Sequence, residues 1–230
     1  MGVAGDVGID RDQWAQRVQQ RGWLWNCAPI TPAATLILAH GAGAPMDSVW
    51  MNEMAERLAA RGVSVLRFEF AYMAQRRLDG GKRPPNQQIK LLECWSEVYE
   101  EVRRHVAGPL AIGGKSMGGR MASLLADELN ADALVCLGYP FYAAGKPEKP
   151  RVAHLADLQA PTLIVQGERD ALGNRAAVEA YTLAPGIELM WLEAGDHDLK
   201  PLKASGFTHE QHLDAAADKI SQWLKSPSSL

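Results

Sequence analysis

A glycine-rich segment near the middle of the chain carries a serine in a setting suited to nucleophilic catalysis. Ser116 stands between Gly114 and Gly118, after an apolar run and before a helical pattern. A serine on such a sharp strand-to-helix turn keeps its hydroxyl exposed, and the small flanking residues let neighbouring backbone approach. The N–H of Met117, at the start of the helix, would face a developing oxyanion. The pattern therefore predicts an activated serine.

An acid and a base follow later in the chain, each just after a predicted strand. Asp170 comes after the run 162–166, and His197 comes after the run 188–192. We expect His197 to take the proton from Ser116 and Asp170 to hold the imidazole tautomer. Glu168 is a rival acid, earlier in the same loop as Asp170.

Two nucleotide-binding motifs overlap the glycine-rich segments, and both fail. A phosphate-binding P-loop that ends at Lys115 would need a glycine where Pro109 stands. A dinucleotide fingerprint that starts at Gly41 would need a glycine where Met46 stands. We therefore expect no nucleotide and no other cofactor. We also expect no metal ion at His197, although aspartates flank it.

The segments around these residues alternate between strand and helix patterns. Strands are predicted over 35–39, 63–68, 110–112, 133–137, 162–166 and 188–192, with an antiparallel edge strand over 23–27. Helices are predicted from Asp47 or Ser48 to about Arg61, after a cap at Asn86, over 120–129, and from the capping-box pair Thr208 and Gln211 to Leu224. This alternation indicates a doubly wound, mostly parallel sheet covered on both faces, with the active site beyond the carboxyl ends of its strands.

Length and composition are those of an ordinary globular protein. We expect one α/β domain over residues 22–225, with tails at 1–21 and 226–230. With 24 Lys plus Arg against 27 Asp plus Glu, the net charge of −3 excludes a general nucleic-acid binder. The chain shows no membrane-spanning stretch and no secretory signal. The three cysteines, Cys27, Cys94 and Cys136, are far apart, which indicates reduced thiols in a cytoplasmic protein.

Together these segments resemble the α/β-hydrolase superfamily between about Thr35 and Leu224. The run His-Gly-Ala-Gly from His40 is similar to the family's oxyanion loop, and Gly-Lys-Ser-Met-Gly is similar to its nucleophile elbow. The order Ser, Asp, His along the chain is also that of the family. The resemblance implies oxyanion donors at Met117 and at Ala42 or Gly43.

The nearest resemblance is to small bacterial hydrolases of the dienelactone-hydrolase group. That group uses a cysteine nucleophile where this chain has Ser116, so dienelactone is not the expected substrate. The interval from Gly138 to Ala160 is too short for a folded lid, which predicts a minimal fold without a cap domain and an open site. Tyr72, Tyr139 and Phe141 are the expected apolar wall for the substrate.

The expected function is a cofactor-free serine hydrolase that cleaves an ester, thioester, lactone or amide of a small substrate through an acyl-enzyme. The alternative is a binding or scaffold protein that has the fold but no activity. The basic loop 72–85, with Arg76 and Arg77, either attracts anionic substrates or is a solvated surface. We expect a small acyl compound as partner, and a monomer or homodimer.

Overall fold

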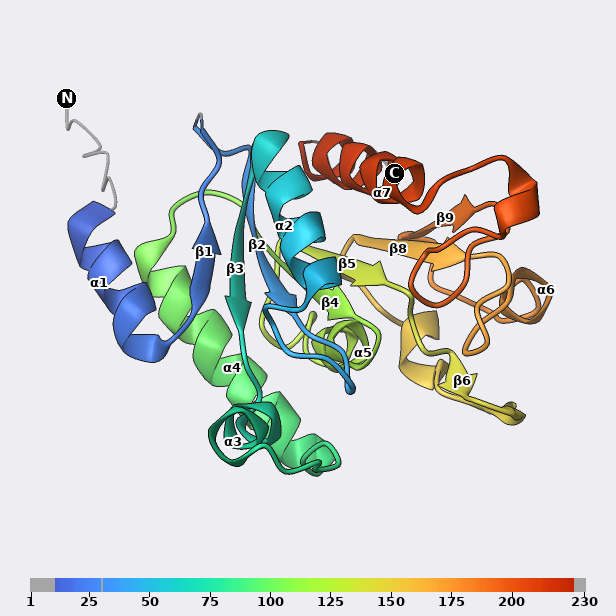
Figure 1. The fold of residues 1–230 in the computed structure, drawn as a ribbon, viewed down its shortest axis with the longest axis horizontal. Coiled ribbons are helices and arrows are strands. Elements are labelled where there is room, and N and C mark those ends of the chain that lie inside the picture. The colour runs from blue at the N-terminus through green and yellow to red at the C-terminus, as the bar shows by residue number, and fades with distance from the viewer. Residues whose placement is uncertain (1–10, 30, 226–230) are drawn as a thin grey trace.

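A twisted, mostly parallel sheet forms the centre of the protein. The computed structural model describes residues 11–29 and 31–225, and seven of the strands in these ranges form one sheet in the order β1-β3-β2-β4-β5-β8-β9 (Figure 1). β1 pairs antiparallel to β3, and every other neighbouring pair is parallel. The strands are β1 (Leu24–Asn26), β2 (Ala34–Ala39), β3 (Val63–Phe68), β4 (Leu110–Lys115), β5 (Ala133–Leu137), β8 (Thr162–Gly167) and β9 (Ile187–Leu192). The predicted fold class and edge strand are confirmed.

Helices cover both faces of the sheet, which explains why the central strands are apolar on both sides. One face carries α1 (Arg11–Arg21), α4 (Gln88–His105), α5 (Met117–Ser123) and the short α6 (Arg175–Val178). The other face carries α2 (Val49–Ala60) and α7 (His209–Leu224). The hydroxyl of Thr208 caps α7 in a capping box with Gln211, as predicted. Within the described chain, no helix combines the length and apolar character needed to cross a bilayer.

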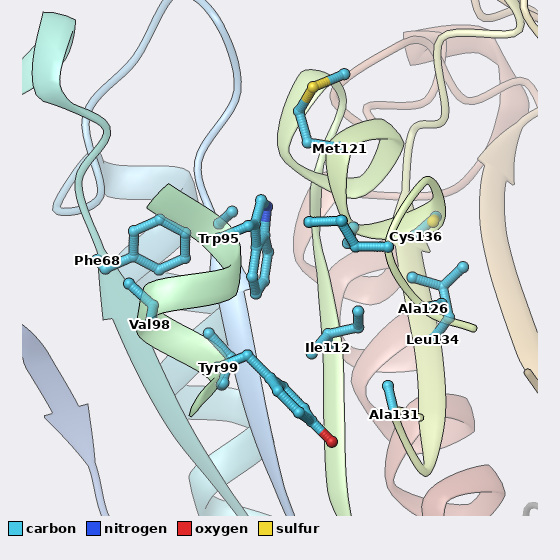
Figure 2. Close-up of a cluster of buried hydrophobic side chains, with 14 of the residues drawn as sticks. Phe68, Trp95, Val98, Tyr99, Ile112, Met121, Ala126, Ala131, Leu134 and Cys136 are labelled. Atoms are coloured by element: carbon cyan, nitrogen blue, oxygen red, sulfur yellow. The ribbon is translucent and has the colours of Figure 1, made fainter. Parts of the chain in front are cut away.

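The larger hydrophobic cluster lies under α4. Trp95 of that helix is fully buried, and its ring meets Phe68 of β3 edge-on, with 4.9 Å between the centroids. Figure 2 shows Trp95 between Phe68 and the side chains of Ile112 and Met121. This packing ties α4 to β3, β4 and α5, and so it supports the turn between β4 and α5 that carries Ser116.

The N-terminal segment is better ordered than the sequence indicated. The prediction of a tail over 1–21 is wrong for residues 11–21, because they form α1. Trp14 is buried, with its ring edge-on to that of Trp25 at 5.5 Å. Arg17 and Arg21 both pair with the buried carboxylate of Glu101 on α4. Residues 1–10 and the expected tail 226–230 lie outside the described residues.

Two other local predictions are also corrected. Residues 72–85 do not form one loop, because α3 (Ala71–Asp79) occupies the first half of that segment. Asn86 does not cap α4, since its Oδ1 accepts the backbone N–H of Tyr72 at 2.9 Å. The interval after β5 agrees with the prediction of a fold without a cap domain. It forms the hairpin β6 (Tyr142–Ala143) and β7 (Lys146–Pro150) and the short 3₁₀ helix η1 (Ala153–Ala156).

Candidate active site

The site is built at the carboxyl ends of β4, β8 and β9. Ser116 lies between the last residue of β4 and the first residue of α5, with φ 52° and ψ −117°. Such a conformation is strained for any residue with a Cβ. The N–H of Ser116 donates to the carbonyl of Leu137 at 2.9 Å, so the neighbouring strand helps to hold the turn.

The flanking glycines are required by close approach of the backbone. A Cβ at Gly114 would lie 2.6 Å from the carbonyl oxygen of Ala39. A Cβ at Gly118 would lie equally close, 2.6 Å, to the carbonyl oxygens of Ala39 and His40. The end of β2 therefore presses directly against the turn, and the loop that follows β2 is brought next to Ser116.

A chain of hydrogen bonds joins the three predicted residues. Ser116 Oγ lies 2.9 Å from His197 Nε2, and His197 Nδ1 lies 2.8 Å from Asp170 Oδ2. Asp170 is fully buried, whereas the His197 side chain is 28% exposed. The structure thus brings together residues that the sequence placed after three different strands. With both ring nitrogens engaged, His197 is oriented for proton transfer to and from Ser116.

The carboxylate of Asp170 has further donors that set its orientation. Its Oδ1 accepts the N–H of Leu172 at 2.8 Å, and its Oδ2 accepts from the Gln166 side-chain amide at 2.9 Å. The Gln166 amide is held in turn by the backbone of Tyr139, whose N–H donates to Oε1 at 2.7 Å. The position of the acid is therefore determined by an extended buried network.

The rival acid is used elsewhere. Glu168 pairs with Arg175 at 2.9 Å, and its second oxygen accepts the N–H of Ala194 at 3.0 Å. Its carboxylate holds the start of the loop that carries His197. It makes no hydrogen bond to the imidazole among those of the described residues.

His40 shapes the loop after β2. The ring is buried, and burial lowers the pKa of His40, so it is neutral near pH 7. Its Nε2 accepts the N–H of Phe70 at 3.1 Å, so the remaining proton is on Nδ1 and is donated to the carbonyl of Gly41 at 2.7 Å. The imidazole therefore anchors the loop after β2 through both of its nitrogens.

Tyr72 holds the same loop from α3. Its hydroxyl lies 3.3 Å from the carbonyl oxygen of Gly41 and 3.0 Å from that of Ala42. Burial raises the pKa of Tyr72 to about 12, so the hydroxyl stays protonated and donates. In a trans peptide the N–H points opposite to the carbonyl. The N–H groups of Ala42 and Gly43 are therefore turned away from Tyr72, and both residues line the hollow beside Ser116.

This hollow has a volume of about 380 Å³. Its lining combines the loop after β2, the start of α2, the end of β4 and the loop that carries His197: Gly41, Ala42, Gly43, Ala44, Ser48, Trp50, Met51, Lys115, Ser116, His197 and Asp198. Three of these residues, Ser48, Trp50 and Met51, carry no motif and were not among the predicted site residues. Only their position just after the predicted oxyanion loop indicates that they lie near the site.

The expected apolar wall is wrong for all three aromatic residues. Tyr139 and Phe141 are fully buried in the core, where their rings meet edge-on at 4.8 Å between centroids. Tyr72 is also buried, and its hydroxyl holds the loop after β2. Within the basic segment, Arg77 is not free, because it pairs with Asp47 and Glu69 at 2.8 and 2.7 Å.

Comparison with known proteins shows which protein family this sequence matches and which solved structures have a similar fold. A model of the alpha/beta hydrolase domain matches residues 32–225. A search of the curated proteins found no match. The fold is similar to that of an α/β serine hydrolase without a lid from Xanthomonas campestris, at 20% identity and a TM-score of 0.62, over 89% of this chain and 86% of that one.

Two further solved structures have similar folds. One is a dienelactone hydrolase from Anabaena variabilis, at 22% identity and a TM-score of 0.62, over 86% of this chain and 87% of the other. The second is the esterase domain of a Rhodothermus marinus protein, at 15% identity and a TM-score of 0.62, over 87% of this chain and 90% of that domain. At these identities the likeness concerns the fold.

Proposed function

The chain belongs to the alpha/beta hydrolase family, and from this premise we propose that it is a serine hydrolase with Ser116, His197 and Asp170 as its catalytic triad. The proposed reaction is cleavage of an ester, thioester, lactone or amide of a small substrate through an acyl-enzyme. The observation that carries this proposal is the hydrogen-bonded chain from Ser116 through His197 to Asp170 at the hollow. A serine, a base and an orienting acid in this order are what nucleophilic acyl transfer requires.

In the proposed acylation step, Ser116 Oγ attacks the substrate carbonyl carbon while His197 Nε2 accepts the hydroxyl proton. Asp170 stabilises the resulting imidazolium and keeps the ring in its productive tautomer. The negative charge on the carbonyl oxygen is met by the N–H of Met117 and by an N–H of the loop after β2, from Ala42 or Gly43. The tetrahedral intermediate then collapses, and the leaving group takes the proton from His197.

Deacylation repeats the same sequence with water. His197 takes a proton from water, the hydroxide oxygen attacks the acyl carbon, and Ser116 leaves with the proton that His197 returns. The two oxyanion donors serve both half-reactions, because the charge develops on the same oxygen. These donors are favourable only where they are held rigidly, and Tyr72 and His40 provide that rigidity.

The form of the hollow favours a small acyl compound as the substrate. At about 380 Å³, it is comparable to the smaller ligand sites of proteins. Trp50 and Met51 give one apolar side, while Lys115 and Asp198 give a polar one. We place the protein in the cytoplasm, and its three unpaired cysteines, Cys27, Cys94 and Cys136, suit a reducing compartment.

Labelling with a fluorophosphonate tests the proposal directly. The purified protein should form one covalent adduct, which peptide mass spectrometry should locate on Ser116. Ser116→Ala should abolish the adduct, and His197→Gln should slow its formation by several orders of magnitude, because an unassisted serine is a poor nucleophile. Ser205→Ala is the matched control, since Ser205 does not line the hollow and should leave labelling unchanged.

Hydrolysis of short p-nitrophenyl esters should show the same pattern across these variants. A folded wild-type protein that neither labels at Ser116 nor hydrolyses these esters would contradict the proposal. That result would favour the alternative of a binding or scaffold protein that has the fold without the activity.

A further inference from the structure

A buried ammonium group lies beside the proposed triad and has no role in the reaction described above. Lys115 is the last residue of β4, and its side chain is 9% exposed. Its Nζ donates to the carbonyl oxygen of His197 at 2.7 Å and lies 3.1 Å from Asp198 Oδ1. It also lies 5.5 Å from the centre of the Trp50 ring, a distance suited to a cation–π contact.

Burial of a lysine is expensive unless its charge is compensated. Burial lowers the pKa of Lys115, and Asp198 opposes that shift. Among the carboxylates that oppose the shift, that of Asp198 has the largest effect, and it is itself 67% exposed. A simple structural lysine would place its charge in water and leave its stem in the core.

The loop that receives this ammonium is strained. Ala194 and Leu199, on either side of His197, have positive φ values of 52° and 63° although neither is glycine. Such conformations persist where surrounding contacts impose them. One further contact comes from Trp50, whose Nε1 donates to the carbonyl of Asp198 at 3.0 Å.

The space around the ammonium is shaped for it. Gly138 has a φ of 62°, and a Cβ there would lie 2.7 Å from the His197 carbonyl oxygen and 3.3 Å from Lys115 Nζ. Glycine is therefore needed at the end of β5 so that Lys115 can reach the main chain of His197. The ends of β4 and β5 and the loop after β9 thus meet at the hydrogen bond from Lys115 to the His197 carbonyl.

We propose that Lys115 is a positioning residue that clamps the main chain of His197 to the segment that carries the nucleophile. This inference rests on the proposed function. Lys115 and Ser116 are consecutive, so the clamp links nucleophile and base through one peptide unit and not through the width of the sheet. The 2.9 Å contact between Ser116 Oγ and His197 Nε2 then depends on the 2.7 Å bond from Lys115 to the His197 carbonyl.

The charges around His197 make the clamp separable from its electrostatic effect. Asp170 contacts the imidazole, Asp196 and Asp198 flank His197 along the chain, Lys115 contacts its carbonyl from β4, and His209 of α7 contacts the carbonyl of Asp198. The charges of Lys115 and Asp198 are opposite and adjacent, so removal of both together leaves little net change in charge next to the imidazole. It also removes the hydrogen bond from Lys115 to the His197 carbonyl, which is the clamp.

The test compares Lys115→Met, Asp198→Asn and the double variant, with Lys90→Met as control. Methionine keeps the apolar stem of lysine, and Lys90 is an exposed lysine on α4, away from the hollow. For each protein we would measure kcat and KM for p-nitrophenyl acetate as a function of pH, and the melting temperature.

Lys115→Met should lower the maximal kcat by roughly 10- to 100-fold with little change in KM, because the base is no longer held at the right distance. Asp198→Asn keeps the hydrogen bond from Lys115 to the His197 carbonyl, so kcat should fall less than in Lys115→Met. In the double variant kcat should stay as low as in Lys115→Met, whereas a purely electrostatic role predicts that removal of both opposite charges restores it.

A folded Lys115→Met protein with wild-type kcat would overturn the inference while leaving the proposed function intact. If that variant does not fold, the double variant decides, since it leaves no unpaired Asp198 carboxylate, and a wild-type kcat in the folded double variant would overturn the inference. A wild-type protein without fluorophosphonate labelling or esterase activity would instead overturn the proposed function, and with it the clamp as a catalytic device.

Discussion

Replacement of Asp170 by asparagine removes one charge and leaves the shape of the side chain almost unchanged. In the structure, two N–H donors converge on Oδ2, from His197 Nδ1 at 2.8 Å and from the Gln166 amide at 2.9 Å. A third, from Leu172, reaches Oδ1 at 2.8 Å. The wild-type carboxylate accepts all three, whereas an asparagine amide has only one oxygen.

Either orientation of the new amide is unfavourable. If its oxygen stays with Leu172, its NH₂ faces two donors, and His197 relieves the conflict by moving its proton from Nδ1 to Nε2. The nitrogen next to Ser116 then carries a proton and cannot accept another. If the amide flips, the tautomer is kept but the half-buried N–H of Leu172 loses its acceptor, at a cost of about 1 kcal/mol. Gln166 cannot turn away, because the backbone of Tyr139 holds both ends of its amide.

The wrong tautomer and the lost stabilisation of the imidazolium together should lower kcat/KM by about 10³–10⁴-fold, or about 4–5.5 kcal/mol. The assay is hydrolysis of p-nitrophenyl acetate across the neutral pH range, with the rate of fluorophosphonate labelling as a second readout. Asp157→Asn is the matched control, because Asp157 does not line the hollow. A fall of less than about tenfold in a protein with the wild-type melting temperature would refute the assignment of Asp170 as the orienting acid.

Three further predictions test the supports of the site and of the fold. Tyr72→Phe removes the hydroxyl that holds the carbonyl of Ala42. The value of kcat/KM should fall about tenfold, which is less than the loss of an oxyanion donor itself would cause. The free energy of unfolding, measured in urea, should fall by about 1 kcal/mol. Gly118→Ala should give little folded protein by circular dichroism, because its Cβ would lie 2.6 Å from two backbone carbonyls. Burial raises the pKa of Glu101, but its ion pairs with the arginines of α1 outweigh burial and hold that pKa below the usual 4.5. The ion pairs therefore stabilise the protein fully above pH 4.5, and this stabilisation is lost as the pH falls through the lowered pKa. Glu101→Gln should therefore cost about 1–3 kcal/mol at neutral pH, discounted for the half-exposed arginines, and thermal melts should show that the difference shrinks in acid.

The strands and the three principal site residues could be predicted because their signals are local. A strand buried on both faces requires consecutive apolar residues, as in the run that became β2. The elbow requires small residues on both sides of Ser116, and the residues just after each parallel strand emerge at the same edge of the sheet. The prediction for β4 stopped at Ile112, because glycines are poor strand formers. The structure extends β4 to Lys115, since β2 and β5 pair with it on either side.

The roles of the aromatic residues could not be predicted in this way. An aromatic side chain near a strand end has the same local signature whether it faces a substrate or the core. Tyr139 and Phe141 face the core, and Tyr72, on α3, holds the loop after β2. The N-terminal helix was missed for a related reason, since its order depends on contacts with Trp25 and Glu101, both outside the helix itself.

By itself, the sequence determined the fold class and the family resemblance, and it indicated Ser116, His197 and Asp170 as the candidate nucleophile, base and acid, because each of these depends on residue types over short spacings. Only the tertiary structure decided what surrounds them: the lining of the hollow by α2, the engagement of Glu168 by Arg175, and the clamp from Lys115 to the His197 loop. These features depend on distances between separate segments of the chain. Such distances are set by how the helices and loops pack on the sheet, which no local pattern encodes.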